Sequence, residues 1–167
     1  NFPHNPTGAT ISAIQQKRIV ELIQDSDTIL FSDEMYRYLE YEEEIRLPSM
    51  ADLTDQAVTL SGMSKSLALA GLRIGWLTTK NPQWLADFLS FKDYTTICNS
   101  APSEILAIMG LKAREQILRR NHDIIRNNLL ILDDFFSNHR AYFEWYQPDA
   151  GPVAFPRLKP KLDANEF

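Results

Sequence analysis

The amino-acid sequence predicts an α/β protein with three layers, a mostly parallel sheet with helices on both faces, followed by the start of a smaller α+β unit. In the first part of the chain, short apolar runs of strand length alternate with segments of helical period. The apolar runs are continuous, which is typical of strands buried on both faces of a parallel sheet. A long helical segment then leads into short aromatic runs, which indicates the entry to a second unit.

The elements of the first part follow in chain order. Residues 1–8 are rich in proline and asparagine, so they predict a loop. Ser12 is a candidate N-cap for a helix with one apolar face. Residues 39–54 are acidic and irregular, so we expect a surface excursion there. Three buried strands are predicted, at 28–32, 57–60 and 74–79.

Helices dominate the second part of the chain. One is predicted from about Pro82 to Tyr94, a second from about Ser103, and a third from about Glu115 to Asn138. Aromatic strands are expected at 142–146 and 153–155, with a turn between them.

The composition narrows the classes of function. The chain has 167 residues, of which 44 % are hydrophobic and 23 % charged, and its net charge of −5 is mixed along the sequence. No basic patch for nucleic acid or membranes and no cluster of metal ligands is present in the sequence, so we expect no nucleic acid, membrane or metal partner. Cys98 is the single cysteine, which favours a reducing, cytoplasmic setting. Because the sequence starts without methionine, we expect a fragment of a longer polypeptide.

One short stretch concentrates residues that can bind a ligand. Residues 60–76, LSGMSKSLALAGLRIGW, contain Lys65 and, eight positions later, Arg73 between two glycines. Desolvation and a nearby cation both favour an uncharged amine, which attacks carbonyl carbons, and arginine suits a phosphate dianion. The stretch therefore predicts a site for an aldehyde that carries a phosphate, with the Ser64 hydroxyl as a further phosphate contact. A surface lysine and a snorkelling arginine would produce the same pattern.

Two other segments carry candidate binding residues. Asp33 follows the first predicted strand, where α/β proteins place ligand contacts, and Tyr36 lies three residues further on. A carboxylate can keep a heteroaromatic nitrogen protonated, and a phenol can donate to an oxygen on the same ring. Pro6 forces Asn5 out of helical geometry, which leaves its amide as a fixed donor. A helix cap, a core-edge tyrosine and an ordinary Asn-Pro turn would explain these three residues equally well.

The order of the motifs resembles the class I and II aminotransferases. N-P-T-G at 5–8 is followed by D-x-x-Y at 33–36 and then by S-K and G-x-R-x-G within 64–75. Members of this family are pyridoxal 5′-phosphate (PLP) enzymes of fold type I. The resemblance implies that residues 1–115 are the second half of the large PLP-binding domain. Residues 116–167 would be a connecting helix and the beginning of the small domain.

The resemblance also implies a role for each matching residue. Lys65 would form a Schiff base with PLP and then carry a proton. Asp33 would keep the pyridine nitrogen protonated, so that the ring accepts electrons. Tyr36 would act with these two in catalysis, and the bond between Asn5 and Pro6 would be cis. The other cofactor contacts would come from Tyr36 and Asn5 to the ring oxygen and from Ser64 and Arg73 to the phosphate.

Some family features differ or are expected outside this chain. Gly62 stands where many relatives have serine, so we expect one hydroxyl fewer at the phosphate. The glycine-rich phosphate turn is expected upstream of residue 1, and the arginine for the substrate carboxylate downstream of residue 167. Residues 95–100 resemble the segment that reaches the neighbouring subunit, so we expect a homodimer.

The sequence therefore predicts a PLP-dependent aminotransferase of amino acid metabolism, with a biosynthetic role. Its substrates would be an amino acid and a 2-oxo acid. Another fold type I reaction, by a carbon–sulfur lyase, a synthase or an oxidase, would use the same residues and stays open. A catalytically inert fragment stays open as well.

Overall fold

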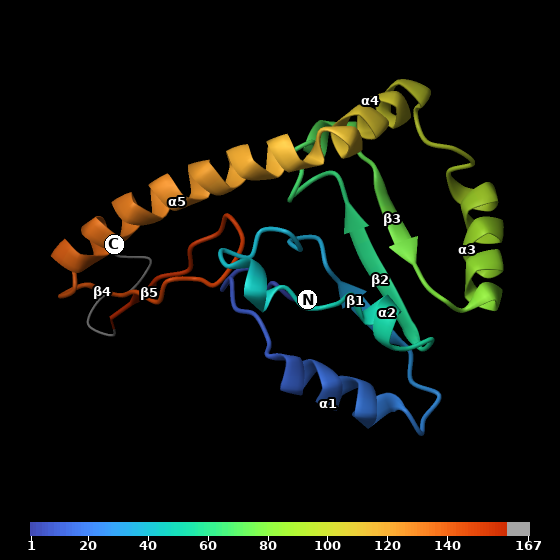
Figure 1. Cartoon of the computed structure of the whole chain (residues 1–167), viewed down its shortest axis with the longest axis horizontal. Helices are drawn as coiled ribbons and strands as arrows, with labels where there is room; N and C mark the ends of the chain where they lie inside the picture. The colour runs from blue at the N-terminus through green and yellow to red at the C-terminus, as the bar shows by residue number, and fades with distance from the viewer. Residues whose placement is uncertain (160–167) are drawn as a thin grey trace.

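A three-stranded mixed sheet forms the centre of the protein, which we describe from a computed structural model over residues 1–159 (Figure 1). Its spatial order is β1 (Leu30–Asp33), β2 (Ala57–Gly62) and β3 (Gly75–Thr78). β1 is parallel to β2, and β3 is antiparallel to it. The predicted α/β fold class is confirmed.

Helix α1 (Ala13–Ile23) begins where the sequence predicts. The Ser12 side chain accepts a hydrogen bond from the Gln15 amide, and the Gln15 side chain accepts one from the Ser12 amide. This reciprocal capping box satisfies two amides that a helix start leaves without partners. Gln16 and Ile23 are buried, whereas Ile14 and Leu22 are exposed, so only part of the apolar face of the helix is covered.

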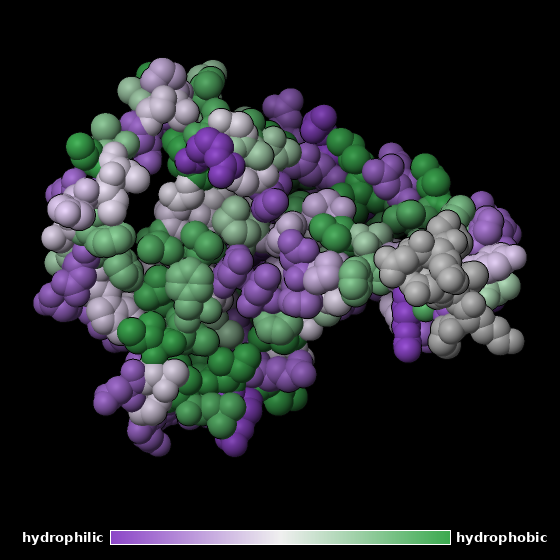
Figure 2. Space-filling model, turned by 180° about the vertical axis from the view of Figure 1, so that it is seen from behind, coloured by the Kyte–Doolittle hydropathy of each residue, from purple (hydrophilic) through white to green (hydrophobic). Residues whose placement is uncertain are grey.

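The expected burial of all three strands is correct only for β2. Phe31 in β1 is 56 % exposed, and every residue of β3 is exposed. Within residues 1–159, β1 and β3 are the outer strands, whereas β2 has a neighbour on each side and also packs against α2 (Met50–Leu53). Figure 2 shows hydrophobic residues gathered in a broad band on one face of the molecule.

The three predicted long helices are confirmed with small shifts of their ends. They are α3 (Pro82–Thr95), α4 (Ala101–Lys112) and α5 (Arg114–Asn138). Helix α4 packs against the segment after β2, where Met63, Leu67 and Ala107 form a buried cluster. Helix α5 runs along the upper side of the molecule in Figure 1, from this cluster towards the C-terminal strands. No helix within residues 1–159 is both long and apolar enough to cross a membrane.

A small second sheet follows α5. β4 (Phe143–Glu144) pairs antiparallel with β5 (Arg157–Leu158). β4 lies inside the predicted strand at 142–146, but the strand predicted at 153–155 is wrong, and the pairing occurs further along the chain. Pro152 and Pro156 flank that segment, and proline has no amide to donate to a sheet. Residues 160–167 of the predicted second unit lie outside the described residues.

The acidic segment 39–54 is not simply a surface excursion. It contains the short 3-10 helix η1 (Glu43–Ile45) as well as α2. Leu39, Glu40 and Met50 are nonetheless buried. Glu40 can be buried because its carboxylate is paired with the Arg46 guanidinium at 3.1 Å, which offsets the cost of removing a charge from water.

Candidate functional site

Two of the predicted site residues, Asn5 and Lys65, lie beside the side chain of a third, Tyr36. Asn5 Nδ2 donates a hydrogen bond to the Tyr36 hydroxyl at 3.2 Å. Lys65 Nζ lies 5.8 Å from the centroid of the Tyr36 ring. Tyr36 itself is buried, with 7 % of its surface exposed. A phenol, an amide and an amine from three separate motifs therefore share one place.

The end of β1 positions Tyr36 and Asp33. The ladder between β1 and β2 continues one step past Asp33, because the Glu34 amide donates to the Leu60 carbonyl at 2.9 Å. The chain then turns, and Asp33 Oδ1 accepts a hydrogen bond from the Met35 amide at 3.0 Å. Asp33 is half-buried, and its hydrogen bond with the Met35 amide caps this turn. The alternative role was a helix cap, but the residues that follow Asp33 form a turn and not a helix. One carboxylate oxygen of Asp33 is occupied by this turn.

The loop that carries Asn5 is tied to the same strand end. The Phe2 amide donates to the Asp33 carbonyl at 3.3 Å, and the Gly8 amide donates to the His4 carbonyl at 2.7 Å. The bond between Asn5 and Pro6 is cis, as the resemblance implied, and so is the bond before Pro3. The loop therefore holds the Asn5 amide beside Tyr36 through backbone contacts.

A tight turn presents Lys65 at the end of β2. The Ala68 amide donates to the Lys65 carbonyl at 3.0 Å, and the Leu69 amide donates to the Met63 carbonyl at 2.9 Å. The expected burial of Lys65 is wrong, because its side chain is exposed. Ser66 and Leu67 are the residues of this turn that point inwards, with 5 % and 6 % exposure. The turn uses these neighbours for packing and leaves the lysine on the outer side.

The predicted phosphate contacts lie opposite each other at the end of β2 and β3. The Met63 amide donates to the Ile74 carbonyl at 3.0 Å, which extends the ladder by one residue. Ser64 follows Met63 and Arg73 precedes Ile74, so both residues lie outside the strands themselves. Arg73 is exposed, has a left-handed backbone with φ +55°, and donates from Nη1 to the Ala70 carbonyl at 3.1 Å.

Close packing of the strands explains the glycine at position 62. A Cβ atom on Gly62 would lie 2.9 Å from both the Gly75 Cα and the Ile74 carbonyl oxygen. Real Cβ atoms do not approach backbone this closely, so a serine there would push β3 away from β2. The difference from the family pattern at Gly62 is thus set by the approach of Gly75.

The sequence did not reveal that residues 148–151 complete one wall of the site. The amides of Asp149 and Ala150 donate to the Gly8 carbonyl at 3.1 and 3.0 Å, and the Gly151 amide donates to the Leu39 carbonyl at 2.9 Å. A Cβ on Gly151 would lie 3.6 Å from the Tyr36 ring. The prolines and glycine in this segment signalled only a turn, because contacts over such a distance in sequence leave no local pattern.

Tyr41 holds residues 148–151 in place through two hydrogen bonds. Its hydroxyl donates to the Gly151 carbonyl at 2.7 Å, and its amide donates to the Asp149 carbonyl at 3.0 Å. Burial, with a smaller contribution from the negative charge of Asp149, raises the pKa of Tyr41 to about 12. The phenol therefore stays protonated and can keep donating to Gly151.

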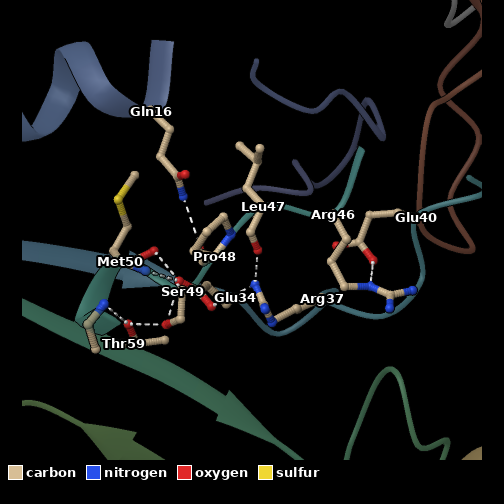
Figure 3. Close-up of polar contacts among 12 residues, drawn as sticks. Gln16, Glu34, Arg37, Glu40, Arg46, Leu47, Pro48, Ser49, Met50 and Thr59 are labelled. Atoms are coloured by element: carbon tan, nitrogen blue, oxygen red, sulfur yellow. Dashed lines mark hydrogen bonds and ion pairs between the residues drawn. The ribbon is translucent and has the colours of Figure 1, made fainter. Parts of the chain in front are cut away.

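A buried polar network around Glu34 joins the residue after β1 to α2 and to Thr59 of β2 (Figure 3). Glu34 Oε1 accepts hydrogen bonds from the Ser32 hydroxyl at 3.1 Å, the Ser49 hydroxyl at 3.1 Å and the Met50 amide at 2.9 Å. Arg37 lies 3.8 Å from the other carboxylate oxygen. Glu34 directly follows Asp33, so this network fixes the backbone from which the site residues project.

The donor set fits the ring and the aldehyde of PLP. Asp33 supplies a carboxylate, Asn5 and Tyr36 supply donors, and Lys65 supplies an accessible amine at the same edge of the sheet. At the phosphate end, the Ala70 carbonyl takes one of the five N–H groups of the Arg73 guanidinium, which leaves the others for a phosphate. No group of three or more His, Cys, Asp and Glu side chains that could hold a metal ion occurs in the part of the chain that the structure describes.

Known proteins place these features in context. The family described as "Aminotransferase class I and II" matches residues 1–167. The chain is 29 % identical to "Putative aminotransferase YugH" of Bacillus subtilis (strain 168) over 160 residues, which are 94 % of this chain and 40 % of that protein. It is 25 % identical to "Capreomycidine synthase" of Streptomyces vinaceus over 168 residues, 100 % of this chain and 42 % of that protein.

Solved structures agree in fold. A PLP-dependent aminotransferase from Streptococcus suis 89-1591 superposes with a TM-score of 0.84 and 29 % identity, covering 93 % of this chain and 40 % of that one. The chain thus spans about 40 % of the length of the relatives that it matches.

Proposed function

This chain belongs to the class I and II aminotransferase family, and we propose that it acts in a PLP-dependent enzyme that moves an amino group between an amino acid and a 2-oxo acid. Enzymes of this family use PLP as their cofactor. The observation that carries the proposal is the convergence of Asn5, Tyr36 and Lys65, since each comes from a different motif. Such a group can receive one small ring with an aldehyde.

The side chains of this site suit the steps of amino-group transfer. When bound, PLP supplies an electron-accepting ring for the carbon that loses its proton. Lys65 Nζ would hold the cofactor through its aldehyde carbon, with loss of water. When the amino group of the substrate takes its place, the released amine would carry a proton between the substrate Cα and that carbon. Asp33 would hold a proton on the ring nitrogen. Because the Tyr36 hydroxyl accepts from Asn5, its own hydrogen is free to donate to the ring oxygen.

The remaining predictions about the protein belong to the same proposal. Ser64 and Arg73 would bind the phosphate, Arg73 through the N–H groups that the Ala70 carbonyl does not use. Residues 1–115 would be the second half of the large domain, and 116–167 the connecting helix and the beginning of the small domain. A homodimer, a cytoplasmic location and a biosynthetic role remain expectations from the sequence.

A synthase reaction is the second candidate. Capreomycidine synthase of Streptomyces vinaceus matches the whole chain at 25 % identity, close to the 29 % of the aminotransferase YugH. The residues at positions 33, 36 and 65 would serve either reaction, because both begin with the same loss of a proton. Product analysis separates them: an aminotransferase converts PLP to pyridoxamine phosphate when given an amino acid, whereas a synthase regenerates PLP.

The first experiment tests the covalent role of Lys65 in the intact protein. After addition of PLP and reduction with borohydride, peptide mapping by mass spectrometry should find a pyridoxyl group on Lys65. The Lys65→Ala variant should carry none, whereas Lys80→Ala, which removes another exposed lysine, should be labelled like wild type. An unlabelled wild-type protein, or equal labelling of Lys65→Ala, would refute the assignment and favour an inert fragment.

Two further variants test the ring and the phosphate. Asp33→Ala should still be labelled at Lys65 but should exchange the substrate α-proton slower by several orders of magnitude. Normal exchange would contradict the role of Asp33. Arg73→Ala should chiefly weaken PLP affinity, and an unchanged affinity would count against Arg73 as a phosphate ligand.

A further inference from the structure

Two consecutive residues of helix α5 bind the two loops that carry Lys65 and Tyr36. Asn121 Nδ2 donates to the Ser66 carbonyl at 2.9 Å. His122 Nε2 lies 2.9 Å from the Tyr38 carbonyl. Consecutive residues of a helix point about 100° apart, so one turn of α5 can reach two loops on different sides.

The bond from Asn121 completes the turn around Lys65. Asn121 and Ser66 are both buried, with 9 % and 5 % exposure, so an unpaired Ser66 carbonyl would lack water as a substitute partner. The neighbouring carbonyls of Met63 and Lys65 are already occupied by amides within the turn. Asn121 thus adds a hydrogen bond from α5 to the apolar packing of α4 against the same turn.

His122 does the same for the segment after Tyr36. A carbonyl oxygen only accepts, so Nε2 must carry the hydrogen. Its other ring nitrogen, Nδ1, is buried and has no hydrogen-bond partner among residues 1–159. Leaving such an atom unpaired is unfavourable. The hydrogen bond from His122 Nε2 to the Tyr38 carbonyl therefore offsets the free-energy cost of the unpaired Nδ1.

The backbone at Tyr38 needs this support. Tyr38 has φ +74°, a left-handed conformation that is unfavourable for a residue with a side chain. The guanidinium groups of Arg37 and Arg46 lie 5.3 and 5.0 Å from the centroid of its ring, which holds the side chain. His122 holds the carbonyl, and Tyr36 lies two residues before it.

We propose that Asn121 and His122 are positioning residues that together set the place of the Lys65 amine relative to the Tyr36 phenol. The inference rests on the proposed function, because it takes both groups to act on the same PLP molecule. Helix α5 is 25 residues long and continues to the C-terminal strands. A movement of the first half of α5 would shift both loops together, so the position of the Lys65 amine relative to the Tyr36 phenol would be preserved.

The experiment uses neutral variants with matched controls in the intact protein with PLP. Asn121→Ala removes the donor to Ser66, and Asn127→Ala makes the same change at an exposed position of α5. His122→Leu removes the donor to Tyr38, and His122→Gln keeps an amide donor. We expect Asn121→Ala and His122→Leu to shift the pH midpoint of the visible PLP absorption by about half a unit. Their kcat should fall about fivefold to tenfold with KM nearly unchanged.

The control variants decide whether the effect is specific. Asn127→Ala should match wild type, and His122→Gln should restore most of what His122→Leu loses. If Asn121→Ala and His122→Leu keep the wild-type pH midpoint and kcat, or if Asn127→Ala shows the same changes, the proposal is overturned.

A measurement without PLP separates this inference from the proposed function. Hydrogen exchange should show the Ala68 and Leu69 amides about tenfold less protected in Asn121→Ala than in Asn127→Ala, since both amides close the Lys65 turn. If wild type binds no PLP but the exchange effect is present, the proposed function fails and the role of Asn121 in holding the loop stands. Equal protection in the two variants overturns the positioning role in either case.

Discussion

Removal of the Glu34 carboxylate should be among the most destabilising changes at the strand ends. The side chain is buried, and its Oε1 accepts from two hydroxyls and the Met50 amide. A carboxylate only accepts, so the Ser49 hydroxyl must point to Glu34 and the Thr59 hydroxyl must then donate to Ser49, 3.1 Å away. The hydroxyls therefore donate in one direction, from Thr59 to Ser49 and from Ser49 to Glu34, and the Glu34 carboxylate is the final acceptor.

The size of the effect follows from the groups that lose their partner. In Glu34→Ala the Met50 amide stays buried without an acceptor, which costs about 1–3 kcal/mol. The Arg37 guanidinium, 3.8 Å from the carboxylate and partly buried, loses its counter-charge, while the hydroxyls can turn to other acceptors. We therefore expect a loss of about 3 kcal/mol of unfolding free energy. Glu34→Gln keeps an acceptor oxygen and should lose about 1 kcal/mol.

Urea unfolding of the intact protein, followed by tryptophan fluorescence, measures these losses. Glu21→Ala is the matched control, because Glu21 forms ion pairs with Lys17 and Arg18 but is exposed, and such pairs contribute about 0–1 kcal/mol. The reasoning is refuted if Glu34→Ala loses less than about 1 kcal/mol, or no more than Glu21→Ala.

Three other changes test separate contacts by urea unfolding. Burial raises the pKa of Tyr41 to about 12, so its protonated phenol stabilises the fold fully below pH 10, and this contribution is lost between about pH 10 and 12. We set this loss of unfolding free energy at about 1–2 kcal/mol, because the phenol is only half-buried. Tyr41→Phe should lose less stability over the same pH range, and an equal pH dependence of stability in both proteins would contradict the reasoning. Gly8→Ala should cost at least about 3 kcal/mol, because Gly8 has φ +68° and a Cβ there would lie 2.2 Å from the Pro148 Cβ; a loss below 1 kcal/mol would show that the wall moves freely. Ser12→Ala should cost about 1 kcal/mol through loss of the N-cap, and an unchanged midpoint would mean that the cap does not matter.

Features encoded within a few residues could be predicted from the sequence. The capping role of Ser12, the long helix to Asn138 and the motifs around Asp33 and Lys65 depend on neighbours in sequence, and the helices were placed within a few residues of their ends. The family, the fold type and the cofactor of the family, inferred from the order of the motifs, are confirmed by the comparisons.

Features that depend on distant parts of the chain could not be predicted. The exposure of Lys65 follows from which of its neighbours meet α4, and the orientation of Arg73 follows from its own left-handed backbone. The buried network of Glu34 joins residues from β1, α2 and β2. None of these contacts leaves a period or a turn signal in the sequence.

The wall at 148–151 shows how the site depends on such contacts. The Gly8 carbonyl accepts from two amides of this wall, and the Leu39 carbonyl accepts from Gly151, so the wall joins the loop of Asn5 to the segment after Tyr36. Displacement of residues 148–151 would therefore release both the loop that carries Asn5 and the segment that follows Tyr36, the two partners of the Asn5–Tyr36 hydrogen bond. Asn121 and His122 of α5 separately hold the Lys65 turn and the Tyr38 carbonyl. The phenol of Tyr36 is thus held by α5 and by residues 148–151, two segments from the second half of the chain. The reacting groups lie in the first half of the chain, but their geometry is set by the second half.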